Sequence, residues 1–240
     1  MLEEIALNAW PAPQQILVDG WVLRLAEGFT RRANSVNPIY RGQRDVEEKI
    51  AFCERLYRAR GLPVIFKMTS AVEPADLDQR LEERGYRIDV RAQVQCMDLG
   101  RAPVAEASDA KCWPGICEEW ITQYMAFNDV PAHRREILST ILQGIACPVH
   151  SVILMDEGKA VACGMAVLQG EYVGLFDIVT CKERRRRGLG TKLVRALLAW
   201  GQGRGARKSY LQVMMSNTPA LGLYRKLGFE PAYQYWYRCL

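Results

Sequence analysis

Hydrophobic and polar positions along the chain change between the period of helices and the period of strands. Over residues 45–61, apolar side chains recur at helical spacing between a possible N-cap at Asp45 and a stop at Gly61, which predicts a helix. A second helix is predicted over PADLDQRLEERGY, between Pro74 and Gly85. Strands are predicted over ILVDGWVLRLA, RRANSVNPI, PVIFKMT and RIDVRAQVQCMDL. The first hundred residues therefore have an α/β pattern.

A stretch of small and polar residues, GRAPVAEASDA at 100–110, has no periodicity and is typical of a linker. We therefore predict two domains, residues 1–104 and 105–240. The second begins with two predicted helices, GICEEWITQYMAFN and AHRREILSTILQGI, followed by the strands HSVILMDEG, AVACGMAVLQG and YVGLFDIVT. After a glycine-containing loop and a helix, it ends with the strand SYLQVMM, the helix TPALGLYRKLGF and the strand AYQYWYRCL.

The two halves end alike, which indicates an internal repeat. A shift of 143 residues places four residues of the first half on Ala220, Tyr224, Gly228 and Phe229, namely Leu77, Leu81, Gly85 and Tyr86. Both halves then contain a strand, a helix, a glycine followed by an aromatic residue, and a further strand. We predict that they are two copies of one structural unit.

Composition narrows the class of protein. The 240 residues are 49% hydrophobic and 25% charged, as in globular proteins, and no run of 18 apolar residues is present. Together with the acidic start MLEEIALNAW, this predicts a cytoplasmic protein without a membrane partner. The eight cysteines form no CxxC pair and the two histidines have no zinc-ligand spacing, so we expect neither a metal nor disulfides. The net charge of +5 is too modest to indicate nucleic acid.

The segment TCKERRRRGLGTKLVRALLAWG, from Thr180 to Gly201, places a glycine-containing loop between a strand and an amphipathic helix. The first turn of a helix has unpaired N–H groups and a partial positive charge, and glycines let an anion approach the backbone. Arginines add planar donors for phosphate oxygens. This combination favours a pyrophosphate site over a solvated charge run or a nucleic-acid surface, and Arg184 is expected to face solvent.

Spacing decides between known phosphate loops. GLGTK lacks the gap of a Walker loop, and Leu193 stands where a dinucleotide fingerprint needs its third glycine. Arg185, Gly188 and Gly190 do satisfy the pattern [RQ]xxGx[GA], and here the chain resembles the GNAT superfamily of acyl-CoA-dependent N-acyltransferases. The resemblance covers about residues 110–240, and it implies the mixed α/β sheet of that fold, in a pseudo-tandem arrangement.

By this resemblance, the strand LFDIVT lies along the pantetheine arm of acetyl-CoA, the loop amides hold the pyrophosphate, and the strand SYLQVMM diverges to admit the thioester. The resemblance extends through Asn217, Tyr224, Gly228 and Phe229. The implied acetyl-CoA-binding residues are Ile178, Val179, Thr180, Arg185, Arg186, Arg187, Gly188, Leu189, Gly190, Thr191 and Asn217.

Direct transfer requires an acid that protonates the departing thiolate. A phenol with a pKa of about 10 suits a thiol with a pKa of about 8.5, and by resemblance Tyr224 is that acid. The base is less well defined. Asp177 is our candidate, acting directly or through water, with Glu171 and Asp129 as alternatives. For each of the three, a surface carboxylate without a catalytic role is the favoured interpretation.

Several residues also have structural interpretations. Trp113, Trp120 and Tyr124, spaced by 7 and 4, are expected first as the core face of a helix and second as a substrate wall, and His133 as a surface residue. In the first half, YRGQRDVEEKI lacks the RxxGxG pattern and carries acidic residues that repel phosphate, and Leu81 stands where the acid would be. The first half is therefore expected to be a degenerate copy without cofactor binding.

These observations predict an N-acetyltransferase that moves an acetyl group from acetyl-CoA to a primary amine of a small molecule, by direct attack in a ternary complex. A protein or peptide acceptor and a non-catalytic CoA-binding module are the alternatives. We expect a monomer or a homodimer.

Overall fold

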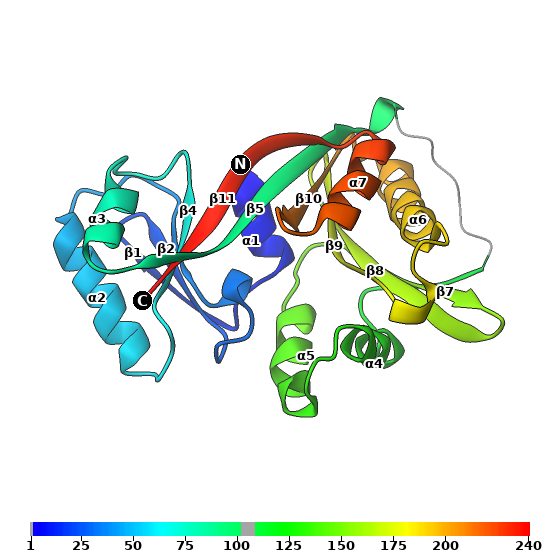
Figure 1. Cartoon of the computed structure of the whole chain (residues 1–240), viewed down its shortest axis with the longest axis horizontal. Helices are drawn as coiled ribbons and strands as arrows, with labels where there is room; N and C mark the ends of the chain where they lie inside the picture. The colour runs from blue at the N-terminus through cyan, green and yellow to red at the C-terminus, as the bar shows by residue number, and fades with distance from the viewer. Residues whose placement is uncertain (1, 102–108) are drawn as a thin grey trace. The chain divides into compact units, whose positions relative to one another are not determined.

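The computed structural model describes residues 2–101 and 109–240, and the chain forms two compact units (Figure 1). Unit 1 contains Met1–Gln93, Met214–Ser216 and Tyr233–Leu240, and unit 2 contains Val94–Val213 and Asn217–Ala232. The predicted domain boundary between residues 104 and 105 lies outside the described residues, so it stays a prediction. The mixed α/β fold that the sequence predicts is confirmed.

Unit 1 is built on a sheet with the strand order β1-β2-β3-β4-β11, in which β3 and β4 are parallel and the other pairs are antiparallel. Its elements are α1 (Leu2–Ala9), β1 (Gln14–Val18), β2 (Trp21–Leu25), η1 (Arg31–Ala33), β3 (Val36–Pro38), α2 (Val46–Arg58), β4 (Ile65–Thr69), α3 (Leu77–Glu83), the first part of β5 (Arg87–Asp98) and most of β11 (Glu230–Cys239). Apolar side chains of α2 and α3, including Ile50 and Leu81, pack with Trp21 and Phe66 in one core.

Unit 2 has the strand order β10-β9-β8-β7-β6, in which β9 and β10 are parallel and the other pairs are antiparallel. Its elements include η2 (Leu99–Arg101), β6 (Ala110–Pro114), α4 (Glu118–Phe127), η3 (Ala132–Arg134), α5 (Arg135–Gln143), β7 (Val149–Asp156), β8 (Lys159–Gln169), β9 (Tyr172–Thr180), η4 (Lys182–Arg184), α6 (Leu189–Gly203), β10 (Lys208–Met214) and α7 (Thr218–Leu227). Figure 1 shows α4 and α5 on one side of β7–β9 and α6 on the other.

The predicted repeat is visible in the element boundaries. Helices α2 and α6 begin at Val46 and Leu189, strands β4 and β10 at Ile65 and Lys208, and strands β5 and β11 at Arg87 and Glu230, which is a shift of 143 in each pair. Helices α3 and α7 end with the same cap: Gly85 and Gly228 have φ values of 89° and 96°. The next amides, Tyr86 N–H and Phe229 N–H, donate to Leu81 and Tyr224 at 3.0 Å.

The last strand does not stay with the second half of the chain. In β11, Trp236 pairs with Met68 and Tyr237 with Lys67, so its end is an inner strand of unit 1. Arg238, almost fully buried, forms an ion pair with Asp78 of α3 at 2.8 Å. Each compact unit therefore contains residues from both halves of the chain: unit 1 includes the end of β11, and unit 2 includes the end of β5.

The structure corrects the expectation for Trp113 and adds a helix that was not predicted. Trp113 was expected on a helix with Trp120 and Tyr124, but it lies in strand β6 and pairs with Ser151 of β7. Pro114 ends β6 and Gly115 follows it, and these two residues keep the helix from extending back to Trp113, because proline and glycine both disfavour a continuous helix. Helix α1 was not predicted, since its eight residues are too few for a clear helical period.

Candidate functional site

A β-bulge in β9 defines the centre of the candidate site. Cys163 pairs with Val179 and Met165 with Phe176, so Asp177 and Ile178 of β9 together face one residue of β8. Asp177 adopts the left-handed conformation, with φ of 53°. The bulge turns the backbone of β9 at the position where the sequence predicts the thioester.

The residue opposite the bulge is Gly164, and the structure shows why it has no side chain. A Cβ at this position would lie 2.6 Å from Ile178 Cδ1 and 3.2 Å from Leu193 Cδ2. The bulged residue Ile178 therefore fills the space over Gly164. Sequence reasoning missed this position, for which the only signal was a glycine inside the apolar run AVACGMAVLQG.

Trp120 of α4 forms a hydrogen bond with Gly164 of β8. Its indole Nε1–H donates to the carbonyl oxygen of Gly164 at 3.1 Å, and its ring stacks on Tyr124 with centroids 5.3 Å apart. Trp120 is fully buried, as the first of the two interpretations predicted. The hydrogen bond connects α4 to the strand position that faces the bulge, a function that the helical spacing alone could not indicate.

Strands β9 and β10 stop pairing beside the bulge. Their parallel register runs from Tyr172–Lys208 to Leu175–Leu211, and within the described chain no register pair follows, although both strands continue. Backbone groups of residues 176–180 that face β10 consequently lack a neighbouring strand. Ile178, Val179 and Thr180 lie in this half-buried stretch, where an extended ligand could pair with the main chain.

The loop after β9 leads to a helix N-terminus without a side-chain cap. Gly188 is the N-cap of α6 with φ of 77°, and no side chain caps the helix. The helical hydrogen bonds begin with Lys192 N–H donating to Gly188 O at 3.0 Å, so the amides of residues 189–191 have no partner within the helix. This is the arrangement that attracts a phosphate.

Gly188 and Gly190 serve two different purposes. Gly188 takes a left-handed conformation that glycine adopts without strain, and a Cβ there would meet open space. A Cβ on Gly190 would lie 2.8 Å from Leu223 Cδ1, so this glycine lets α6 approach α7. The spacing of the two glycines therefore follows from backbone conformation at one position and from helix packing at the other.

The four arginines divide into one structural and three exposed side chains. Arg184 forms ion pairs with Asp156 at 2.8 Å and Glu157 at 3.5 Å and is half-buried, which corrects the expectation that it faces solvent. Residues 185–187 are exposed, and among the described residues none of their side chains forms an ion pair. Arg185 Nε–H only makes a long hydrogen bond to Thr180 O, at 3.5 Å. These three charges remain available to an anion at the start of α6.

Tyr224, on α7, has a buried ring that packs edge to face on Phe229, with ring centroids 5.8 Å apart. Burial raises the pKa of Tyr224 to about 12. Within the described residues, its hydroxyl has no hydrogen-bond partner, so the O–H can donate to a ligand. Asn217 has an observed structural role, since its Oδ1 accepts from Ala220 N–H at 3.3 Å and caps α7.

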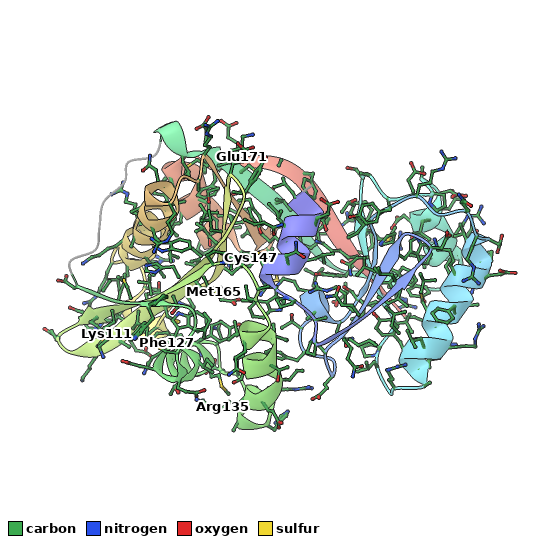
Figure 2. All side chains as sticks on the ribbon, turned by 180° about the vertical axis from the view of Figure 1, so that it is seen from behind. Lys111, Phe127, Arg135, Cys147, Met165 and Glu171 are labelled. Carbon is green, nitrogen blue, oxygen red and sulfur yellow. The ribbon has the colours of Figure 1, made fainter. Side chains whose placement is uncertain are left out.

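The three candidate carboxylates have different surroundings. Asp129 and Glu171 are exposed and form ion pairs with Lys182 at 2.5 Å and Lys208 at 3.3 Å. Figure 2 shows Glu171 away from Met165, the residue that pairs next to the bulge. Asp177 lies in the bulge itself and is half-buried, and its charge, after burial, contributes to raising the pKa of the Cys163 thiol. Geometry thus favours Asp177 over the other two.

Residues 2–101 and 109–240 contain no group of three or more His, Cys, Asp or Glu side chains placed to hold a metal ion. In the same residues, no helix has the length and apolar character needed to cross a membrane.

Comparisons with known proteins agree with the motif. Residues 1–238 match the family described as "Probable histone acetyltransferase Rv0428c C-terminal". The "Uncharacterized N-acetyltransferase YobR" of Bacillus subtilis is 30% identical over 99% of this chain and 96% of its own length. The "Probable histone acetyltransferase Rv0428c" of Mycobacterium tuberculosis is 27% identical over 95% of this chain and 70% of its length.

Solved structures show the same fold in both units. A tandem GNAT protein from the clavulanic acid biosynthesis pathway superposes with a TM-score of 0.71 at 15% identity, covering 100% of this chain and 87% of its own. A GCN5-related N-acetyltransferase from Kribbella flavida has a TM-score of 0.70 at 18% identity, covering 99% and 94%.

The geometry of the bulge generates a prediction for Gly164→Ala. The added methyl would collide with Ile178, and overpacking of this kind costs about 1–3 kcal/mol. We expect a lower midpoint in urea unfolding and weaker CoA binding in calorimetry, because β9 must shift at the bulge. Gly203→Ala is the matched control, since a Cβ there meets open space at the end of α6. If Gly164→Ala behaved like Gly203→Ala in both measurements, the bulge would not depend on this glycine.

Proposed function

Because the chain belongs to the acetyltransferase family that matches residues 1–238, and with it to the GNAT superfamily, we propose that it transfers acetyl from acetyl-CoA to a primary amine of a small molecule. The proposal rests on three backbone features that follow one another along unit 2. They are the bulge in β9, the end of pairing between β9 and β10, and the N-terminus of α6 without a side-chain cap. Together they place two stretches of main chain where a ligand could bind, residues 178–180 beyond the pairing with β10 and the amides of residues 189–191.

Each part of acetyl-CoA has a counterpart in this segment. The pyrophosphate would bind the amides of Leu189, Gly190 and Thr191, with the exposed side chains of residues 185–187 supplying charge. The amides of the pantetheine arm would pair with the main chain of residues 178–180, where β10 no longer does. Asn217 contributes by capping α7, the helix that carries Tyr224, and a direct contact between Asn217 and CoA remains a prediction.

The reaction proposed for unit 2 needs no covalent enzyme intermediate. The amine nitrogen attacks the thioester carbonyl carbon, the C–S bond breaks, and the thiolate receives the proton of the Tyr224 hydroxyl. Backbone N–H groups at the bulge would polarise the carbonyl oxygen, which is usually a large part of the catalysis of acyl transfer. Asp177, directly or through a water molecule, would take the proton that the amine loses.

A protein amine is the second candidate acceptor. The printed descriptions of the matched family and of the mycobacterial relative both say "histone acetyltransferase", which favours a lysine or N-terminal amine. The pathway named for the tandem GNAT structure is a small-molecule one, and that protein matches both units. A screen of acetyl-CoA-dependent thiol release over amino acids, polyamines, aminoglycosides and peptides separates the two. CoA binding without any turnover would instead favour a non-catalytic module.

Tyr224→Phe tests the catalytic assignment. We expect kcat for thiol release to fall by about tenfold or more, as for the loss of a general acid, with CoA affinity unchanged within about twofold. Tyr172→Phe is the control, because Tyr172 stands at the opposite end of β9 beside Lys208. Equal kcat values for Tyr224→Phe and Tyr172→Phe would show that Tyr224 is not the acid.

The raised pKa of Tyr224 gives a pH prediction. A pKa of about 12 keeps the phenol protonated at every pH below this value, so its proton is lost only as the pH rises towards 12. We therefore expect kcat to show no fall between pH 7 and pH 10 that depends on Tyr224. An alkaline limb near pH 8–9 that is present in the unsubstituted enzyme and absent in Tyr224→Phe would contradict this.

A further inference from the structure

Unit 1 contains a loop at the position that corresponds to the anion loop of unit 2. Helices α2 and α6 start 143 residues apart, at Val46 and Leu189, so Gln43 and Arg44 correspond to Arg186 and Arg187. The two helix starts differ in their caps. Asp45 accepts from Glu48 N–H at 3.0 Å and caps α2, whereas Gly188 leaves α6 without a side-chain cap.

The loop before α2 also binds a carboxylate, and this carboxylate comes from the chain itself. Asp19, in the turn between β1 and β2, accepts from Gln43 N–H at 3.0 Å on Oδ1 and 2.9 Å on Oδ2. Its Oδ2 also accepts from Arg44 N–H at 2.9 Å. Two successive backbone amides thus converge on one oxyanion, in the way that loop amides hold a phosphate or carboxylate ligand.

A buried cation completes this arrangement. Lys49 of α2 is only 2% exposed, and its Nζ lies 3.1 Å from Asp19 Oδ2 and 2.6 Å from Asp19 O. The same ammonium group lies 4.2 Å from the centroid of the Trp21 ring. Hydrogen bonds from the Gln43 and Arg44 amides lower the pKa of Asp19 to about 2, and Lys49 lowers it further by a smaller amount. The Asp19 carboxylate is therefore ionised at neutral pH and neutralises Lys49.

The surrounding space fits Asp19 closely on one side and opens on the other. A Cβ on Gly42 would lie 2.2 Å from Asp19 Oδ2 and 2.5 Å from Asp19 O, so glycine is required for the carboxylate to fit. Beside the loop is a cavity of about 200 Å³ that is lined by Arg41, Arg44, Lys49 and Glu73 among others. Because Asp19 already neutralises Lys49, the excess of positive charge in this cavity comes from Arg41 and Arg44 against Glu73.

We propose that the Asp19 carboxylate is a built-in ligand of unit 1, which closes the loop before α2 to other anions, and that its removal turns this loop into a site for a small carboxylate. The physical reason is that removal leaves the Gln43 and Arg44 amides and the buried Lys49 ammonium without their acceptor. An external carboxylate could enter through the adjoining cavity and restore those contacts.

Chemical rescue tests this proposal. Asp19→Ala is expected to unfold at a lower temperature than the unsubstituted protein, and sodium acetate should restore part of the difference in a saturable way, at concentrations on the order of 10 mM. Sodium chloride at equal ionic strength should not. Asp19→Asn is the matched control, because its amide fills the site and leaves no room for acetate. The unsubstituted protein is titrated with acetate in the same way, and its change in Tm is subtracted to remove any effect of acetate on unit 2.

Three results would overturn the proposal: an unchanged Tm in Asp19→Ala, equal acetate shifts in Asp19→Ala and Asp19→Asn, or no acetate shift beyond that of the unsubstituted protein. If Asp19→Ala is insoluble, refolding yield in acetate against chloride replaces Tm as the measurement. A yield that is higher in acetate for Asp19→Ala but not for Asp19→Asn supports the built-in ligand, and equal yields contradict it.

Discussion

The candidate site in unit 2 depends on the β-bulge between β8 and β9. Two residues of β9 face one residue of β8, and the extra residue turns the end of β9 out of the regular sheet. Gly164 makes this possible, because Ile178 occupies the place of its missing side chain, and Trp120 holds the Gly164 carbonyl from the other side. The pairing of β9 with β10 ends at Leu175, just before the bulge, and the loop after β9 leads to the uncapped start of α6.

The two units show how the same strand–loop–helix arrangement can be open or closed. In unit 2 the helix start has a glycine cap and three exposed arginines. In unit 1 the corresponding region holds two carboxylates, Asp45 at the helix cap and Asp19 on the loop amides. Acidic residues in the first half were expected to repel phosphate. The structure adds a more direct reason, since the amides of Gln43, Arg44 and Glu48 already donate to carboxylates of the chain itself.

Much of this arrangement was predictable because it depends on local sequence signals. The spacing of Arg185, Gly188 and Gly190 located the loop, and the shift of 143 residues found the repeated elements and their glycine caps. The bulge was not predictable, since an extra residue in one strand is defined only by pairing with another. The contacts of Asp19 with residues 43 and 44, and of β11 with β4, also join distant segments. The spacing of hydrophobic and polar residues within a segment contains no information about contacts with a distant segment.

The role of Arg184 illustrates the same limit within the most informative segment. Four consecutive arginines have identical side chains, and the first of them is distinguished by its ion pairs with Asp156, at the end of β7, and Glu157. The run therefore could not be divided into structural and ligand-facing members from the sequence. The prediction of an anion site in this loop did not depend on that division, because it relied on the glycines and on the elements before and after them.

We propose that one loop of the repeat is open to acetyl-CoA, whereas the other is filled by the chain's own carboxylates. Isothermal titration of the full-length protein with CoA measures this directly. We expect one CoA per chain, with an affinity that falls by about tenfold or more when residues 185–187 are all replaced by alanine, since several charge-assisted hydrogen bonds are lost. Two CoA molecules per chain, or one whose affinity is unaffected by that replacement, would contradict it.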